Sequence, residues 1–459
     1  MRKYTPFSKN LEDLETADLA TLKDVNEGWY IEYKQKITDG KSIAKSLSAL
    51  ANTYGGWLFY GIKEESKHNS VAGEFPGIPT TQIDAAQQTI RSAAAKHMNP
   101  SCHFEIKILS GPCTSINLDV DHAIICITVP QSIEAPHIHE SGRIYRRVAD
   151  ASDPVPETDR YMVDKLFQRS QKKIDYYKRW HDKDPEFSQG ESKSPYIRIM
   201  IEPNLWDLPR PPFHLTTEVL RNILNPVTPR KCVVPFDTVY TRSGGFIARQ
   251  CINNDPNGAT LTWDVGSDLS GDVLVPLNSR QDRLEGIGKF LSHYEQTQSF
   301  LTALEKYRFE TPYVIDLNHI FSMLMSVIET QQALQKFAGW PTDFNIKIKV
   351  LNAWRTIPFV DIKYLIDYMG ENGIPMLLSE TVTAPMGTTP GSFIPISDID
   401  TETEEVSLIR KAVIAFLPIA TAFGLPFYQM ATDDELVKRE NKTVYSYFVE
   451  AGNRASKRS

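Results

Sequence analysis

Two glutamates and a lysine stand close together in NEGWYIEYKQK, residues 26–36, a stretch that is otherwise largely aromatic and apolar. The alternation over 29–36 predicts a strand that carries Glu32 and Lys34 on one face. A carboxylate there can ligate a hard divalent cation, and the ammonium group beside it can neutralise a phosphate. Glu27, just before the strand, can fold back to the same place. The pattern suits phosphodiester chemistry, although a solvated ion pair on an exposed face is the simpler interpretation of Glu32 and Lys34.

A third acidic group can come from the end of the next strand along the chain. The apolar run WLFYGI, residues 57–62, predicts a buried strand, and Glu64 and Glu65 follow it after one lysine. Strand ends and the loops after them often carry active groups, because the sheet holds them on a rigid frame. Either glutamate is therefore available as a third carboxylate.

Local signals predict the elements that position these residues. Asp39-Gly40 predicts a turn, and apolar spacing predicts a helix over 41–53. Gly55-Gly56 lets the chain leave this helix with positive φ, and Asn52 can bond a free backbone group near the helix end. A further helix is predicted at 83–97, with strands at 102–109, 115–120, 122–129 and 142–148. This mixture lacks the regular alternation of a doubly wound sheet, so the expected class is α+β.

The remainder of the chain divides at a polar linker. A charged helix is predicted over 157–180, and DKDPEFSQGESKSP, residues 182–195, is the linker. Strands follow at 195–201, 230–236, 244–252, 259–265 and 271–277, then helices near 283–307, 316–338 and 405–417. The expected organisation is an α+β domain at 1–155, the charged helix and linker at 156–194, a mixed β/α domain at 195–435, and a polar tail at 436–459.

Composition narrows the class of protein. With 459 residues the chain is too long for one ordinary core, and its net charge of −7 counts against a broadly basic nucleic-acid coat. The five cysteines form no CxxC pair and are spaced too loosely for a zinc knuckle, which favours a reducing compartment. The N-terminus lacks the apolar core of a secretory signal, and the apolar run at 412–425 is too short to span a bilayer. We expect a soluble cytoplasmic protein without a membrane role.

Four short motifs in the first part of the chain resemble the Schlafen AlbA_2 domain, a divergent AlbA-like nucleic-acid-binding module. They are, in order, the paired glutamates ending in Glu32-Tyr33-Lys34, the helix end ANTYGG at 51–56, the strand end GIKE at 61–64, and the turn APH at 135–137 that leads to YRR at 145–147. The resemblance covers about a third of the chain.

This resemblance implies a metal-dependent endonuclease. Schlafen proteins with nuclease activity cut structured RNA, transfer RNA especially, with two glutamates, an aspartate and Mg²⁺ or Mn²⁺. By motif position these acids fall on Glu27, Glu32 and Glu64, the expected metal ligands, and Lys34 would contact the phosphate as the fourth catalytic residue. The chain departs from the pattern at Glu64, where an aspartate is expected; the longer side chain moves the carboxylate by on the order of 1 Å. Glu65 is its possible substitute.

The resemblance also implies a surface for nucleic acid. Tyr145 can stack on bases and the cations beside it can neutralise phosphates, although an edge strand with solvated arginines fits the same residues. The expected contact residues are Lys36, Lys41, Lys45, Tyr145, Arg146 and Arg147. With one copy of the domain in the chain, a clamp around RNA requires a homodimer.

Two functions are therefore open from the sequence. The first is cleavage of structured RNA such as tRNA, in preference to DNA, in phage defence or a stress response. The second is a non-catalytic DNA- or RNA-binding transcriptional regulator whose C-terminal domain senses a ligand or a partner.

Overall fold

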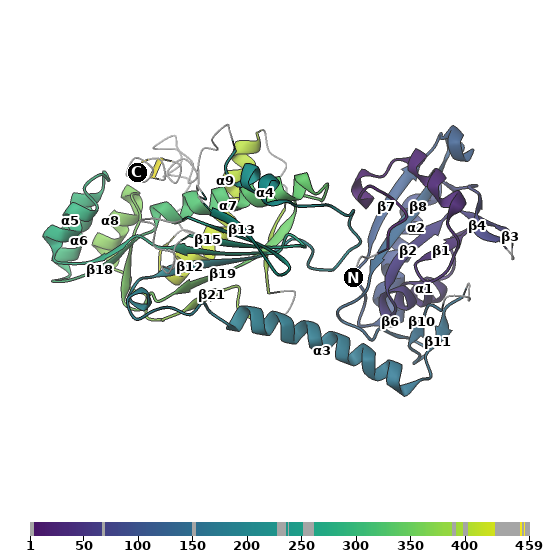
Figure 1. The fold of residues 1–459 in the computed structure, drawn as a ribbon, viewed down its shortest axis with the longest axis horizontal. Helices are drawn as coiled ribbons and strands as arrows, with labels where there is room; N and C mark the ends of the chain where they lie inside the picture. Colours follow the sequence, from purple (N-terminus) through teal and green to yellow (C-terminus); the bar gives the residue numbers. More distant parts are fainter. Residues whose placement is uncertain are drawn as a thin grey trace.

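The computed structural model describes residues 4–66, 69–148, 153–226, 236, 238–250, 261–387, 392–397, 403–426, 450–451 and 454. Two bodies of helices and sheets lie side by side, and the long helix α3, Arg160–Asp182, runs along both (Figure 1). We call the body before α3 the first domain and the body after it the second domain. The mixture of helices and sheets is the α+β class that the sequence predicts.

A five-stranded sheet forms the centre of the first domain. Its strands run in the order β1-β2-β8-β5, with β7 also paired to β8. β1 and β2 are parallel and the other pairs are antiparallel. The bounds are β1 Ile31–Lys34, β2 Gly55–Tyr60, β5 Ile78–Pro79, β7 Glu105–Ser110 and β8 His122–Pro130. Because β1 and β2 are parallel neighbours, the helix between them must cross over one face of the sheet.

Helices cover both faces of this sheet. α1, Gly40–Asn52, and α2, Ile83–His97, pack against each other on one face. The 3₁₀ helices η1, Leu11–Asp13, and η2, Thr16–Asp24, cover the other face over a second set of buried residues. The amphipathic spacing that predicts a helix at 83–97 is confirmed to the residue, because its apolar face is the one buried against α1.

Short elements complete the first domain, and one predicted strand is wrong. They are the hairpin β3 Lys63–Ser66 and β4 Asn69–Glu74, the pairs β6 Met98–Asn99 with β9 Ile138–His139 and β10 Tyr145–Arg146 with β11 Val155–Pro156, and the 3₁₀ helices η3 Thr80–Gln82 and η4 Thr114–Ile116. No strand forms at 115–120. Asn117 adopts the left-handed conformation there, so the chain makes a tight loop closed by the bridge between Cys113 and Leu118.

An eight-stranded sheet forms the centre of the second domain, in the order β13-β14-β15-β16-β12-β19-β21, with β22 also paired to β19. All of its pairs are antiparallel. The bounds are β12 Tyr196–Glu202, β13 Thr238–Arg242, β14 Gly245–Arg249, β15 Thr262–Gly266, β16 Gly271–Pro276, β19 Phe344–Leu351, β21 Val382–Ala384 and β22 Ile394–Ile396. The strand predicted at 230–236 lies, but for its last residue, outside the described residues.

A smaller sheet and several helices surround this sheet. The smaller sheet has the order β17-β18-β20. Its strands are β17 Ser279–Gln281, β18 Tyr313–Asp316 and β20 Thr356–Phe359, and the helices are η5 Glu191–Lys193, α4 Thr217–Leu224, α5 Leu284–Phe290, α6 Thr297–Lys306, α7 Asn318–Phe337, α8 Lys363–Asn372 and α9 Glu404–Ala422. The predicted helix at 283–307 is thus two helices. In the part of the chain that is described, no helix is both long and apolar enough to cross a membrane.

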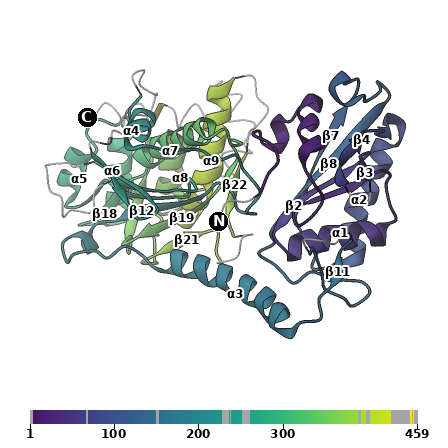
Figure 2. The ribbon, with the colours of Figure 1, turned by 45° about the vertical axis from the view of Figure 1, so that its right-hand side comes forward.

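The two domains are connected by α3 and by direct contacts. Arg169 of α3 donates to the Asn52 carbonyl (3.1 Å), and Trp180, nearer the end of α3, donates to Asp272 of β16 (3.0 Å). Away from α3, the ring of His103 stacks on Trp206 with centroids 4.9 Å apart. In Figure 2 the N-terminal short helices lie on the side of the first domain that faces the second. The first domain is thus attached to the second both through α3 and through the contact of His103 with Trp206.

Candidate active site

Close backbone contacts fix the segment between the two glutamates. The Gly28 amide donates to the Ile31 carbonyl (3.1 Å), and the Trp57 amide of β2 donates to the Tyr30 carbonyl (2.6 Å). A Cβ on Gly56 would overlap that same carbonyl oxygen, and Gly56 has a φ of 147°. The prediction of positive φ at the glycine pair is confirmed, and glycine is needed here so that β2 can lie directly against the segment.

Glu32 is fully buried, and donors surround its carboxylate. Oε1 accepts the Ser46 hydroxyl (2.8 Å) and pairs with the Lys34 ammonium (3.0 Å), while Oε2 pairs with the Arg147 guanidinium (3.1 Å). The Glu32 side chain is 0% exposed, and that of Lys34 is 26% exposed. Burial opposes the charge of Lys34, but Glu32 more than compensates and raises its pKa. The simpler interpretation, a solvated pair on an exposed face, is therefore wrong for Glu32.

Arg147 holds the segment that carries the acids. Its guanidinium is completely buried and donates to the Gly28 carbonyl (2.9 and 2.6 Å) and to the Ile31 carbonyl (3.0 Å), besides pairing with Glu32. Its own amide donates to the Thr53 hydroxyl (2.9 Å). Because one planar group satisfies two carbonyls and a carboxylate, Arg147 fixes residues 28–32 against the end of α1.

Glu27 meets Glu64 because both are attached to the β3–β4 hairpin. The Glu27 amide donates to the Ser70 carbonyl in β4 (3.0 Å), and Glu64 of β3 lies opposite Ala72 of the same hairpin. The Glu64 carboxyl is near enough to raise the pKa of Glu27, and Lys34 is near enough to lower it. The hairpin thus places Glu64, which follows β2, close to Glu27, which precedes β1.

The two oxygens of the Glu27 carboxyl have different surroundings. Oε1 accepts the Tyr33 amide, whereas Oε2 is buried and has no hydrogen-bond partner among the described residues. Burial raises the pKa of Glu27 well above its usual range; the Tyr33 amide opposes this, and the Glu64 carboxyl raises it further. Two carboxyl groups so placed require either a shared proton or a cation between them.

The Glu27–Glu64 pair fits a hard divalent cation, since carboxylate oxygens are the ligands that Mg²⁺ and Mn²⁺ prefer and Oε2 of Glu27 lacks a partner within the described structure. Glu32 is already held by its three donors. Glu65 is exposed, and its carboxylate accepts the Asn69 side-chain amide instead. No group of three or more His, Cys, Asp or Glu side chains within the described ranges is arranged to hold a metal.

The expected nucleic-acid contacts on and before α1 lie near the surface. Lys36 is exposed, and Lys41 is exposed and pairs with Glu140 (2.7 Å). Lys45 is half-buried with its ammonium 5.3 Å from the centre of the Tyr145 ring. Of these three lysines, Lys36 is the one whose ammonium forms neither an ion pair nor a ring contact with a described residue.

The YRR segment is placed differently from the surface strand that the sequence suggests. Tyr145 is 8% exposed and Arg147 is fully buried, while Arg146 forms an ion pair with Glu157. Asn52 fixes this segment, donating to the His137 carbonyl (2.9 Å) and the Tyr145 carbonyl (3.1 Å), which confirms its predicted role with backbone groups. Tyr145 and Arg147 therefore belong to the domain's interior in this structure, and Arg147 lies at the acidic site itself.

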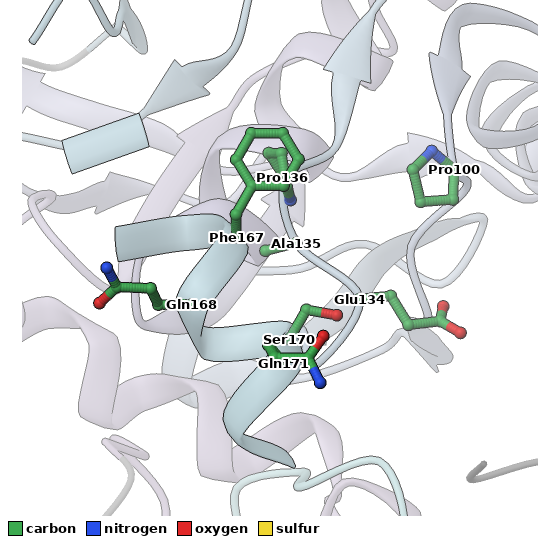
Figure 3. A pocket seen from close by; sticks show the side chains of 8 residues that line it. All are labelled: Pro100, Glu134, Ala135, Pro136, Phe167, Gln168, Ser170 and Gln171. Atoms are coloured by element: carbon green, nitrogen blue, oxygen red, sulfur yellow. The ribbon is translucent and has the colours of Figure 1, made fainter. Parts of the chain in front are cut away.

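A pocket of about 520 Å³ lies between the first domain and α3 (Figure 3). Its walls come from two loops of the first domain and one side of α3: Pro100, Glu134, Ala135, Pro136, Phe167, Gln168, Ser170 and Gln171. None of the predicted site residues lines it.

Two partners of Glu32 give only weak signals in the sequence. Arg147 is 115 residues away from Glu32, and arginine is usually an exposed residue, so YRR predicts a surface strand. The signal that could have identified its role is its spacing of two from Tyr145, which puts both on the buried side of one strand. Ser46 lies beside the apolar face of α1 and carries no such signal.

The comparison with protein families agrees with this location. Residues 27–156 match the family model described as Schlafen, AlbA_2, a family associated with nucleic-acid binding. No curated protein sequence matches the chain significantly. Among solved structures, the DIP2311 protein from Corynebacterium diphtheriae is similar, with 18% identity, a TM-score of 0.20, and coverage of 36% of this chain and 35% of that protein. The match therefore spans about a third of that protein's length. The segment of this chain from Glu27 to Pro156 is a Schlafen AlbA_2 domain.

Proposed function

We propose that the protein is a metal-dependent endonuclease and that the Glu27–Glu64 pair is its metal site. The observation that carries the proposal is the buried Oε2 of Glu27, unpartnered among the described residues, beside a second carboxyl group. A structural role would require the two adjoining carboxyl groups to share a proton, whereas a divalent cation would satisfy both groups and the unpartnered oxygen. Mg²⁺ or Mn²⁺ bound there would polarise a phosphodiester and stabilise the charge that develops on it.

Residues of the chain supply the rest of the chemistry. Lys34 is partly exposed, pairs with Glu32 and is near enough to Glu27 for that charge to raise its pKa, so its ammonium can turn to a phosphate oxygen and neutralise it. When it does so, Oε1 of Glu32 keeps only the Ser46 hydroxyl and becomes available as a further ligand. Arg147 keeps Glu32 and the Gly28–Ile31 turn in place throughout.

The preferred substrate in this proposal is folded RNA of the tRNA type, acted on by a homodimer. The support is the resemblance to the Schlafen nucleases and the single AlbA_2 domain in the chain, since a clamp of two such domains needs two chains. Phage defence or a stress response is the setting we propose for such an activity.

Metal binding and cleavage are the two measurements that test the site. Titration calorimetry with Mn²⁺ should show binding that Glu27→Gln loses and Glu65→Gln keeps, because Glu65 is one residue from Glu64 but is exposed and accepts the Asn69 side-chain amide. Cleavage of total tRNA with Mn²⁺ should disappear in the same variant and in EDTA. Equal Mn²⁺ binding by wild type and Glu27→Gln would refute the metal site.

A second candidate is a non-catalytic nucleic-acid-binding regulator. It is favoured by the three donors that hold Glu32, which leave two rather than three carboxyl groups open. On this alternative Glu27→Gln would bind tRNA and DNA as the wild type does, and neither protein would cut them.

A further inference from the structure

Four aromatic rings gather beside the candidate active site, and they were not among the residues expected to bind nucleic acid. Tyr4 stacks on Tyr30 with centroids 4.8 Å apart, Tyr30 meets Tyr54 at 5.9 Å, and Trp29 meets Tyr54 edge-on at 5.4 Å. Trp29 and Tyr30 belong to the same short segment as Glu27 and Glu32. We call these four side chains the aromatic patch.

The aromatic patch is open to solvent. Tyr54 is 46% exposed, Tyr4 is 36% exposed, and Trp29 and Tyr30 are half-buried. Within the described part of the chain, neither the Trp29 indole N–H nor the hydroxyl groups of Tyr30 and Tyr54 form a hydrogen bond. Rings that serve only to fill a core are covered and have their polar atoms satisfied, as the buried Tyr33 hydroxyl is by the Val25 carbonyl (2.9 Å).

The backbone under the aromatic patch is held firmly. The Tyr30 carbonyl accepts from Trp57, and Arg147 holds the carbonyls on either side, those of Gly28 and Ile31. Tyr54 follows α1 in the tight turn before the glycine pair. A surface that stacks flat ligands benefits from such rigidity, because little conformational freedom is lost on binding.

Charges near the aromatic patch suit a phosphate backbone. Lys34 pairs with Glu32 at the end of the same segment (3.0 Å), and the Arg169 guanidinium of α3 bonds the Asn52 carbonyl (3.1 Å), two residues before Tyr54. Rings with cations beside them are the usual platform for unpaired nucleotides, where each base stacks on a ring and its phosphate meets a cation.

We propose that Trp29, Tyr30, Tyr54 and Tyr4 form a stacking platform for unpaired bases, which holds a single-stranded part of the nucleic acid next to the Glu27–Glu64 pair. This inference deepens the proposed function, and it rests on that function in treating the bound nucleic acid as a substrate. It adds that the part of the substrate at the site is unpaired, as in a loop or a frayed end. The binding itself needs no metal and no cleavage.

Oligonucleotide binding in EDTA tests the platform. Fluorescence anisotropy would compare a 12-nucleotide single strand, as RNA and as DNA, with a 12-base-pair duplex. Tyr54→Ala is expected to weaken single-strand binding about tenfold, since base–aromatic stacking is worth about 1–3 kcal/mol per base, and to leave duplex binding unchanged. Equal losses for RNA and DNA are expected, because every base has a face that can stack.

Matched variants separate the loss of stacking from the loss of a hydroxyl group, of an exposed ring elsewhere, or of the fold. Tyr54→Phe keeps the ring and should bind as the wild type does; Tyr161→Ala removes a ring that is 63% exposed on α3 and should have no effect. Thermal unfolding of Tyr54→Ala should stay close to the wild type because the Tyr54 side chain is 46% exposed and its hydroxyl forms no hydrogen bond with a described residue. Unchanged single-strand binding by Tyr54→Ala, or an equal loss for the duplex, would overturn the inference.

The outcome is distinguishable from that of the proposed function. Ring-dependent binding by a protein that neither binds Mn²⁺ nor cuts RNA would keep the platform and reject the nuclease. Mn²⁺-dependent cleavage that Tyr54→Ala and Trp29→Ala perform at the wild-type rate, with wild-type affinity, would keep the nuclease and reject the platform.

Discussion

At the scale of single residues, burial decides which charged groups of the first domain are structural and which are open. Glu32 and Arg147 are both 0% exposed and compensate each other, whereas Glu27 has an oxygen without a partner among the described residues. From the sequence alone these charged residues cannot be divided into structural and open ones, because their spacing does not reveal how deeply each is buried. The acids of the candidate site were therefore predictable from the sequence. It was not predictable that Glu32 is held by buried partners while Glu27 keeps an oxygen without a partner among the described residues.

Arg147→Met should destabilise the first domain by about 3–5 kcal/mol, because the change leaves Glu32 buried without its fully buried cationic partner. Chemical denaturation with urea measures the effect. Arg143→Met, an exposed arginine four residues earlier, is the control and should stay within about 0.5 kcal/mol of wild type. Adding Glu32→Gln to Arg147→Met should recover part of the loss; no recovery would show that the pairing is not the cause.

Glu202→Gln should change how the stability of the second domain depends on pH. Burial raises the pKa of Glu202 to about 7, so its stabilising contribution is complete below its unfolded pKa and is lost as the pH rises through about 7. The variant, which cannot ionise, should gain up to about 3 kcal/mol on the wild type between pH 5 and pH 8. Calorimetric unfolding at both values measures the gain, and a constant difference would contradict the assignment.

At the scale of elements, the sequence predicts those whose apolar pattern is complete. α1, α2, β2 and β8 lie close to their predicted ranges because their buried faces are uniformly apolar. The sequence did not predict β19, whose apolar pattern is interrupted by two lysines. Lys347 and Lys349 alternate with its isoleucines, yet both are buried, with Lys347 donating to the carbonyls of Pro385 (2.7 Å) and Ser392 (3.0 Å). Backbone acceptors from distant segments make a buried lysine tolerable, and local sequence does not contain them.

Gly56→Ala should destabilise the first domain by more than about 2 kcal/mol. Its φ of 147° is unfavourable for any side chain, and the new Cβ would overlap the Tyr30 carbonyl that β2 contacts. Gly190→Ala is the control, because nothing lies within 4 Å of a Cβ there. Thermal unfolding compares the two variants, and equal melting temperatures would show that β2 can move away from the segment at little cost.

At the scale of the whole molecule, α3 and the contact between His103 and Trp206 hold the domains in one arrangement. Near the end of α3, Tyr177 packs edge-on against Phe393 and its hydroxyl donates to Glu202 (3.3 Å). One helix therefore connects the second domain to the backbone near the aromatic patch, since Arg169 of α3 bonds the Asn52 carbonyl, two residues before Tyr54.

Trp206→Ala should loosen this arrangement without unfolding either domain. A stacked aromatic pair is worth about 0.5–1.5 kcal/mol beyond its area, so local opening at the contact should become roughly fivefold more frequent. Amide hydrogen exchange of residues 101–105 and 203–210 measures it. Exchange in β8, at the centre of the first domain, should not change, and faster exchange there would indicate general destabilisation instead.

The long separation between Glu32 and Arg147 has a consequence for the time at which the site can exist. During synthesis Glu32 leaves the ribosome 115 residues before its buried partner. Contacts so distant in sequence close late in folding, so the turn that presents Glu27, Trp29 and Tyr30 is assembled only when nearly the whole domain has been made. A chain interrupted before residue 147 therefore lacks the buried partner of Glu32 and the guanidinium that fixes this turn.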